Sequence, residues 1–159
     1  MTHLVIGIGN DFRRDDGVGL AVAQVIGQLA LPDTRTMTAI GEPGELLDAW
    51  AGVRRAVVID ATAGDEVIPG RVRRWTPDKF SASTCASSHS FGLPQAYALG
   101  AALGRLPGSL VVFTVDVADT GVGHGLSAEV AAAVPRAAEA VLAELGGPLR
   151  SDLLPTIED

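Results

Sequence analysis

Apolar and polar positions along the chain follow two periods in turn, which predicts strands that alternate with helices. The first β-rich run spans His3 to Ile8 and stops at a glycine. Apolar residues then recur at helical spacing from Asp16 to Leu29, before the break at Leu31 and Pro32. The chain therefore opens with a predicted strand over 3–8, a glycine-rich loop and a predicted helix over 16–29.

The middle of the chain predicts three strands and one helix. Arg35 to Ala39 is a weak candidate strand, and Gly44 to Trp50 a short helix. Arg54 to Asp60 carries four apolar residues and then an acid, a continuous run typical of a strand buried on both faces. Gly70 to Trp75 alternates charged with apolar residues, as a strand near a sheet edge does. We therefore expect the 54–60 strand to be central and the 70–75 strand to lie near an edge.

A polar loop of small residues over Asp78 to Ser88 precedes the next helix and strand. Helical spacing returns from His89 to Gly104, and Pro94 is compatible with this helix if it lies in the first turn. Leu110 to Val115 is a second continuous apolar run. It predicts another strand buried inside the sheet.

The last predicted element is a long alanine-rich helix over Leu126 to Leu145. Ser127 is a suitable N-cap and Gly146 a stop, while Pro135 is expected to kink the helix. Residues 147–159 show no periodicity. We therefore expect a single α/β domain over residues 1–146 and a loosely ordered tail over residues 147–159.

Strands that alternate with helices along the whole chain predict an α/β fold, with a mostly parallel sheet between helical layers. The 159 residues are 47% apolar with a mean hydropathy of +0.29. This is enough for one well-filled core and too short for two ordinary domains.

Charge and cysteine content narrow the function classes. Nineteen acidic residues against 12 basic ones give a net charge of -7, which argues against a nucleic-acid partner. The single cysteine, Cys85, excludes an intramolecular disulfide and a cysteine-rich metal site, and favours a reducing compartment. The N-terminus lacks a signal-peptide pattern, and no apolar run approaches the roughly 20 residues that span a bilayer. We expect a cytoplasmic protein without a membrane segment.

The stretch GIGNDFRRDDGVG over residues 7–19 raises the question of a nucleotide site. A dinucleotide fingerprint needs a third glycine after Gly7 and Gly9, but Phe12 occupies that position. Arg13 and Arg14 could attract a phosphate, yet three aspartates surround them, and carboxylates at a helix start make a poorer anion site. The spacing therefore disfavours a phosphate-binding loop.

Three residues instead suggest a cation site at the carboxyl ends of the strands, where sheets of this kind bind ligands. Asp16 follows the first strand by one loop, Asp60 ends the central strand, and His89 opens the helix before the last strand. Two carboxylates and an imidazole suit a borderline divalent metal such as nickel or zinc, with coordination positions left open.

Each of the three residues also has an ordinary structural interpretation. Asp15 or Asp16 could cap the first helix, Asp60 could be a turn residue, and His89 could be a solvated loop histidine. It is the conjunction of the three that points to a metal.

Other candidate groups are weaker. A thiol nucleophile formed by Cys85 with His89 lacks any accompanying third-member or oxyanion signature. Asp116 and Asp119 follow the last strand and are second-rank acids, because DVADTG is also an ordinary turn sequence.

Four blocks stand out along the chain: GIGNDFRRDDGVG at 7–19, VVIDATAG at 57–64 with the Pro-Gly pair at 69–70, SSHSFGL at 87–93, and GLS at 125–127. Together they resemble the [NiFe]-hydrogenase maturation endopeptidases. Their order and spacing match the family from residue 3 to about residue 145, and the GxGN...DDGxG block is among the most specific parts.

The resemblance implies a three-layer α/β/α sandwich around a mostly parallel, mixed sheet. It implies a protease that removes the C-terminal extension of a hydrogenase large-subunit precursor after nickel insertion. The family's metal-contacting positions map onto Asp16, Asp60 and His89. The nickel belongs to the precursor, so we expect a cytoplasmic monomer with no intrinsic cofactor.

The chain departs from the family in two places. In the segment AIGEPGELL, Glu42 is the only acid before Gly44, and Arg13 and Arg14 stand where many relatives have apolar or small residues. Docking of the substrate and choice of partner are therefore open. Two other functions also stay open: a Rossmann-like nucleotide-binding domain, and a non-catalytic, metal-dependent assembly factor.

Overall fold

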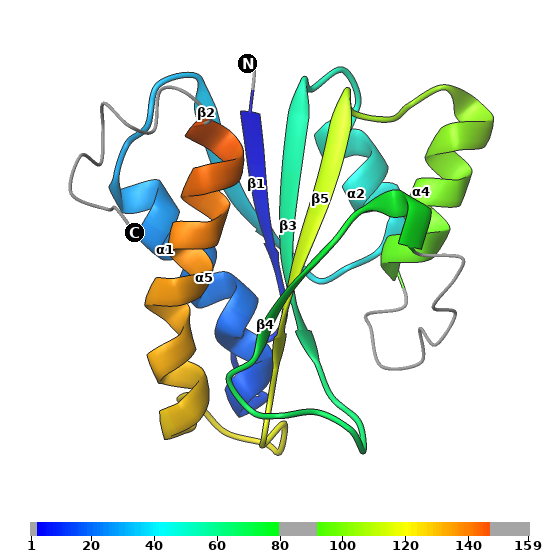
Figure 1. The fold of residues 1–159 in the computed structure, drawn as a ribbon. Helices are drawn as coiled ribbons and strands as arrows, with labels where there is room; N and C mark the ends of the chain where they lie inside the picture. Colours follow the sequence, from blue (N-terminus) through cyan, green and yellow to red (C-terminus); the bar gives the residue numbers. More distant parts are fainter. Residues whose placement is uncertain (1–2, 80–91, 147–159) are drawn as a thin grey trace.

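The computed structural model describes residues 3–79 and 92–146, and its core is one five-stranded sheet (Figure 1). The strands lie in the order β2-β1-β3-β5-β4. The strand bounds are β1 His3–Ile8, β2 Thr34–Ala39, β3 Arg55–Thr62, β4 Val72–Trp75 and β5 Ser109–Asp116. Four of the strands are parallel and β4 alone runs antiparallel, against β5.

The helical elements agree with the predicted alternation. They are η1 Arg14–Gly17, α1 Val18–Gln28, α2 Pro43–Trp50, η2 Pro77–Lys79, α4 Gly92–Leu103 and α5 Ala128–Gly146. The first predicted helix begins two residues late, because its first turn is the 3-10 helix η1. Pro94 does lie in the first turn of α4, and Pro135 lies inside α5. The predicted tail over 147–159 falls outside the described residues.

Helices cover both faces of the sheet, which confirms the three-layer α/β/α sandwich. In Figure 1, α1 and α5 lie on one side of the strands and α2 and α4 on the other. Val57, Ile59 and Phe113 point into the core under α1 and α5. The alternate residues Val58 and Val112 point into the core under α2. The central strand is therefore buried on both faces, as its continuous apolar run predicts.

The order of the first three strands follows from two crossovers, one through α1 and one through α2, on opposite faces of the sheet (Figure 1). From β1 the chain crosses through α1 to β2 on one side, and from β2 it returns through α2 to β3 on the other side of β1. The chain that leaves β1 runs toward β2, whereas the chain that leaves β3 runs toward β4 and β5. The two connections therefore leave neighbouring strands in opposite directions. In open α/β sheets such a switch point opens a crevice outside the carboxyl ends of the strands.

A close approach of α1 to the sheet requires a glycine. A Cβ on Gly19 would lie 2.5 Å from the carbonyl oxygen of Ile8 and 2.6 Å from that of Ile59. The first turn of α1 therefore sits directly on β1 and β3, near their carboxyl ends. A bulkier residue would lift the helix, and with it the preceding loop, away from the switch point.

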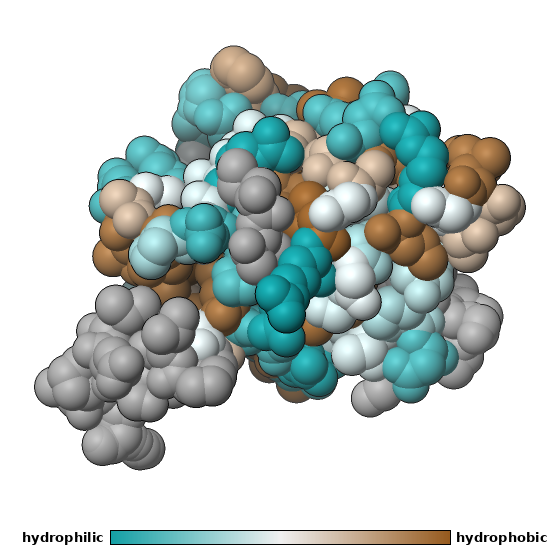
Figure 2. Space-filling view, turned by 90° about the horizontal axis from the view of Figure 1, so that it is seen from above, coloured by the Kyte–Doolittle hydropathy of each residue, from teal (hydrophilic) through white to brown (hydrophobic). Residues whose placement is uncertain are grey.

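The opposite end of the sheet, where β1, β3 and β5 begin, has a different surface (Figure 2). Viewed from that end, hydrophilic residues run across the middle of the molecule. Arg54 and Ser109 are exposed there, at the starts of β3 and β5. Among residues 3–79 and 92–146, no helix combines the length and apolar character needed to cross a membrane.

Candidate functional site

Asp16 lies in η1, which follows the carboxyl end of β1 by one short loop. It is half-buried, and its Oδ2 accepts a hydrogen bond from the backbone N–H of Asn10 at 2.9 Å. Gly9 allows this return of the chain, because a Cβ there would lie 2.0 Å from the carbonyl oxygen of Asp16. Within the described part of the chain, Oδ1 of Asp16 accepts no hydrogen bond. One carboxylate oxygen thus orients the side chain and the other is available to a ligand.

Asp60 occupies the carboxyl end of β3 and is only 3% exposed. Its Oδ1 accepts a hydrogen bond from the backbone N–H of Ala61 at 2.8 Å. It lies one residue beyond the pairing of Gly7 with Ile59, level with the last residue of β1. Asp60 is therefore a strand residue rather than the turn residue of the alternative interpretation.

Because α1 packs closely on β1 and β3, the segments that carry Asp16 and Asp60 lie at the same end of the sheet. A Cβ on Gly19 would collide with the carbonyl of Ile59, the residue before Asp60, and Gly19 lies three residues after Asp16. His89 falls outside the described residues, as does Cys85. Over residues 3–79 and 92–146, no three histidine, cysteine or acidic side chains are grouped as a metal site requires. The three-residue site thus stays a prediction.

Asp15, next to Asp16, has a different and structural role. Its side chain is fully buried and accepts four hydrogen bonds. The donors are the backbone N–H groups of Ala118 (3.0 Å), Asp119 (2.9 Å) and Ser127 (2.6 Å) and the hydroxyl of Ser127 (2.9 Å). Asp15 therefore joins the loop after β1 to the loop after β5, and it does not cap α1, whose N-cap is Gly17.

Burial and hydrogen bonding act in opposite directions on Asp15. Burial raises the pKa of this carboxyl, but the hydrogen bonds from Ser127, Asp119 and Ala118 outweigh burial and hold the pKa below its ordinary value. Asp15 is therefore a carboxylate at neutral pH. Sequence alone could not distinguish it from Asp16, because adjacent residues in a turn point in different directions.

The same two loops are joined at a second point by Arg14 and Gly123. The backbone N–H of Arg14 donates to the carbonyl of Gly123 at 3.0 Å, and the N–H of Gly123 donates to the carbonyl of Phe12 at 2.8 Å. The guanidinium of Arg14 lies over Gly123, where an added Cβ would meet it at 2.8 Å. The rings of Phe12 and His124 meet edge to face, 4.7 Å apart. Arg14 and His124 thus support the loop junction.

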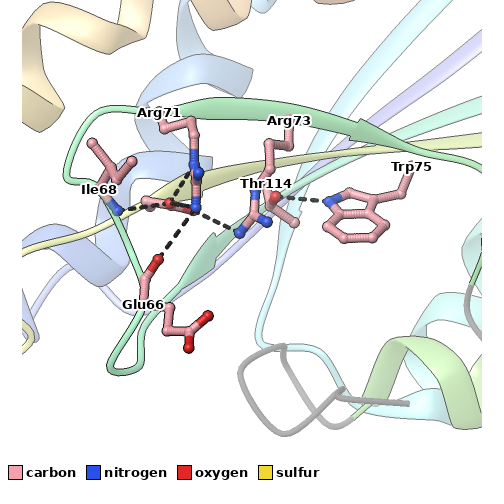
Figure 3. Close-up of polar contacts among 7 residues, drawn as sticks. Glu66, Ile68, Arg71, Arg73, Trp75 and Thr114 are labelled. Carbon is pink, nitrogen blue, oxygen red and sulfur yellow. Dashed lines mark hydrogen bonds and ion pairs between the residues drawn. The ribbon is translucent and has the colours of Figure 1, made fainter. Parts of the chain in front are cut away.

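Asp116, at the carboxyl end of β5, is fully buried and forms ion pairs with two partly exposed arginines. Oδ2 accepts hydrogen bonds from Arg71 Nε and from the backbone N–H of Ile68, both at 2.9 Å. Oδ1 accepts one from Arg73 Nη2 at 3.1 Å. Figure 3 shows both arginines reaching the same carboxylate from β4 and the loop before it. Asp116 is therefore committed to the arginines, and Asp119 is exposed with a 3.8 Å contact to Arg14.

A row of polar residues at one register position crosses β3, β5 and β4. Asp60 is in register with Thr114, which is in register with Arg73. Trp75 Nε1 donates to the Thr114 hydroxyl at 2.9 Å, and the Arg73 guanidinium lies 5.3 Å from the ring centroid of Trp75. The sequence analysis did not identify Arg71 and Arg73 as partners of Asp116. The alternation of charged and apolar residues in β4 was the available signal, but it does not show which carboxylate the arginines contact.

Comparisons with known proteins identify relatives over most of the chain. The family model described as hydrogenase maturation protease (HycI) matches residues 41–144, about two thirds of the chain. This range contains Asp60 and His89 but not Asp16. A search of curated protein sequences finds no significant match.

Several solved structures share the fold. The hydrogenase maturating endopeptidase HybD from E. coli is 25% identical with a TM-score of 0.80, and 94% of each chain is covered. The [NiFe] hydrogenase maturation protease HybD from Thermococcus kodakarensis is 25% identical with a TM-score of 0.70, over 89% of this chain and 97% of that one. The hydrogenase 2 maturation peptidase from a Thaumarchaeota archaeon is 25% identical with a TM-score of 0.68, over 92% and 99%.

Proposed function

The chain belongs to the hydrogenase maturation protease family, and from that premise we propose that it is a processing endopeptidase of [NiFe]-hydrogenase. Its substrate is the large-subunit precursor, from which it removes the C-terminal extension after nickel has been inserted. It acts in the cytoplasm, as a monomer and without a cofactor of its own.

The observation that carries the proposal is the position of Asp16 and Asp60 beside the switch point of the sheet, where this fold class binds its ligands. Asp16 has one carboxylate oxygen without a hydrogen bond among the described residues. Asp60 is held by β3 with its Oδ1 oriented by the next backbone N–H. Both acids are therefore supported by rigid backbone, as a recognition site needs.

In the proposed reaction, Asp16, Asp60 and His89 contact the nickel that the precursor presents. Two carboxylates attract a divalent cation, and an imidazole is a suitable ligand for nickel. A precursor without nickel would bring no charge to balance the carboxylates, so it binds more weakly. Selectivity for the loaded precursor thus follows from the charge of the site.

Two routes lead from this complex to hydrolysis of the peptide bond. In the first, the substrate's nickel lowers the pKa of a bound water, which then attacks the carbonyl carbon. In the second, the carboxylate of Asp16 or Asp60 removes a proton from the attacking water. In both routes the water oxygen bonds to the carbonyl carbon and the amine of the extension leaves with a proton.

The test is to mix the protein with a nickel-loaded precursor and measure the precursor's intact mass. Loss of the C-terminal extension is expected with the wild-type protein, and no loss with the metal-free precursor. Asp16→Asn, Asp60→Asn and His89→Ala should each reduce cleavage at least about a hundredfold, as loss of a metal-contacting or proton-transferring group does.

Asp48→Asn is the matched control, because Asp48 is an exposed acid on α2, outside the loops at the carboxyl ends of the strands, and its carboxylate pairs with Arg105 at 3.0 Å. It should retain activity. Undiminished cleavage in all three site variants would refute the assignment of the site. Tight binding of the loaded precursor with no change in its mass would instead identify an assembly factor.

A further inference from the structure

The loops around the candidate site carry most of the exposed large apolar side chains of the described residues. Phe12 is 63% exposed, Ile40 70%, Ile68 58% and Val122 89%. The described chain has only three others, Leu29, Leu99 and Leu103, and all three are on or directly after helices. We call the first four residues the apolar rim.

Each residue of the apolar rim follows a different parallel strand. Phe12 lies in the loop after β1, Ile40 directly after β2, Ile68 in the loop after β3 and Val122 in the loop after β5. Because these strands are parallel, all four loops emerge at the edge that carries Asp16 and Asp60. The rim therefore surrounds the candidate site, across about three strand spacings or roughly 15 Å.

The backbone of the apolar rim is held in position by hydrogen bonds. The N–H of Phe12 donates to Asn10 Oδ1 at 2.9 Å and that of Ile40 to Glu45 Oε1 at 3.2 Å. The N–H of Ile68 donates to the buried carboxylate of Asp116 at 2.9 Å. Val122 precedes Gly123, which is tied to the Phe12 loop. A loop backbone that is already held in place loses little entropy when a partner covers it, so such a surface is suited to binding.

Five exposed acids and two exposed arginines lie on the same four loops, so the setting of the rim is acidic on balance. The acids are Asp11, Glu42, Asp65, Glu66 and Asp119, and the arginines are Arg13 and Arg14. An apolar ring with acids around an acidic centre complements a partner that presents a cation within an apolar surface. The opposite end of the sheet has hydrophilic residues across its middle instead (Figure 2).

We propose that the apolar rim is the docking surface for the folded body of the metal-loaded precursor. This inference rests on the proposed function and adds the contact surface to it. The rim is wider than one extended peptide, so its occupant is the body of the precursor and not the excised extension alone. The rim contributes to binding of the precursor and not to the chemical step, whereas the site residues contribute to both.

The experiment compares Ile40→Ser and Val122→Ser, singly and together, with the wild-type protein. Both side chains are highly exposed, and serine leaves the net charge unchanged. Leu103→Ser is the matched control, because Leu103 is 55% exposed at the end of α4, which leads into the start of β5 at the opposite end of the sheet from the rim. The Kd for the nickel-loaded precursor and the KM and kcat for its cleavage are measured, with the molecular mass of each variant in solution.

Each rim variant should raise Kd and KM about fivefold and the double variant about 25-fold, with kcat within about twofold of wild type. Leu103→Ser should change none of these values. A double variant that binds within about twofold of wild type overturns the proposal, as does a wild-type dimer that the double variant abolishes.

The outcomes separate this inference from the proposed function. If the wild-type protein binds the precursor without cleaving it, the proposed function fails while the Kd series still decides the role of the rim. If the wild-type protein neither binds nor cleaves the loaded precursor, both are overturned.

Discussion

Replacement of Asp15 tests whether one buried carboxylate holds the two loops that support the site. Asp15→Ala removes the acceptor of three backbone N–H groups and one hydroxyl, which come from residues more than 100 positions away. The hydroxyl of Ser127 can turn to another acceptor. The three backbone donors are fixed, so they lose a charge-assisted acceptor that nothing nearby replaces.

The size of the effect follows from the number of donors. A partly buried donor without an acceptor costs about 1 kcal/mol or somewhat more, so Asp15→Ala should lower the free energy of unfolding by about 3–4 kcal/mol. For a protein of this length that corresponds to a fall in Tm of roughly 6–15 °C. Asp15→Asn keeps one carbonyl oxygen, so its loss should be smaller, about 2 kcal/mol.

The assay is urea unfolding followed by circular dichroism, with amide hydrogen exchange to locate the change. Exchange at Ala118, Asp119 and Ser127 should accelerate more than exchange in β3. Asp119→Asn, in the same loop but exposed, should cost less than about 1 kcal/mol. A loss below about 1 kcal/mol for Asp15→Ala would refute the reasoning that this carboxylate joins the loops.

The pH dependence of the same difference gives an independent check. The pKa of Asp15 in the folded protein lies below its ordinary value of 3.8, so the folded state holds the proton less tightly than the unfolded state. Its contribution to stability is therefore fully present above pH 3.8 and lost as the pH falls through the lower, folded-state pKa. The stability difference between wild type and Asp15→Asn should narrow in that acidic range only.

Three further predictions concern the sheet and its ends. Gly19→Ala should lower the free energy of unfolding in urea by about 1–3 kcal/mol, because its Cβ would meet two strand carbonyls. Gly44→Ala meets nothing within 4 Å and should raise the same free energy by about 0.5–1 kcal/mol. Asp116→Asn should lower the free energy of unfolding by about 3 kcal/mol in the same assay, because two arginines lose a buried counter-charge. Arg74→Ala removes an exposed ion pair and should lower it by less than about 1 kcal/mol. Burial is the main cause that lowers the pKa of His3 below 6.5, and the charges of Arg55 and Arg54 add to it. The free energy of unfolding of the wild-type protein should therefore decrease as the pH falls through 6.5. His3→Gln should remove this pH dependence between pH 7.5 and about 5.

The fold was predictable because its signals are local and repeated. The continuous apolar run of β3 predicts burial on both faces, and the charged-apolar alternation of β4 predicts an edge strand; the structure confirms both. Ser127 does directly precede α5, as predicted for an N-cap. Its hydroxyl, however, donates to Asp15. That bond joins residues 112 apart in sequence, so no local pattern could reveal it.

The site was predictable only in part, for the same physical reason. The rule that ligands bind at the carboxyl ends of strands directs attention to Asp16 and Asp60, whose role as site residues stays a prediction. It does not say which acids near those ends are already neutralised by the protein. That depends on long-range contacts such as Arg71 and Arg73 with Asp116, which form only when the antiparallel β4 pairs with β5.

The structure narrows the choice among the five aspartates that the sequence analysis singled out near the ends of the strands. Asp15 is saturated by four donors, Asp116 is neutralised by two arginines, and Asp119 is exposed and bonded within its own loop. Binding a cation through Asp15 or Asp116 would leave their buried donors without an acceptor, a cost that weighs against either as a ligand. Asp16 carries a smaller obligation, with one backbone donor among the hydrogen bonds of the described residues. Of these candidates, Asp16 is thus the acid best able to meet an incoming cation, and it follows β1 at the switch point between β1 and β3.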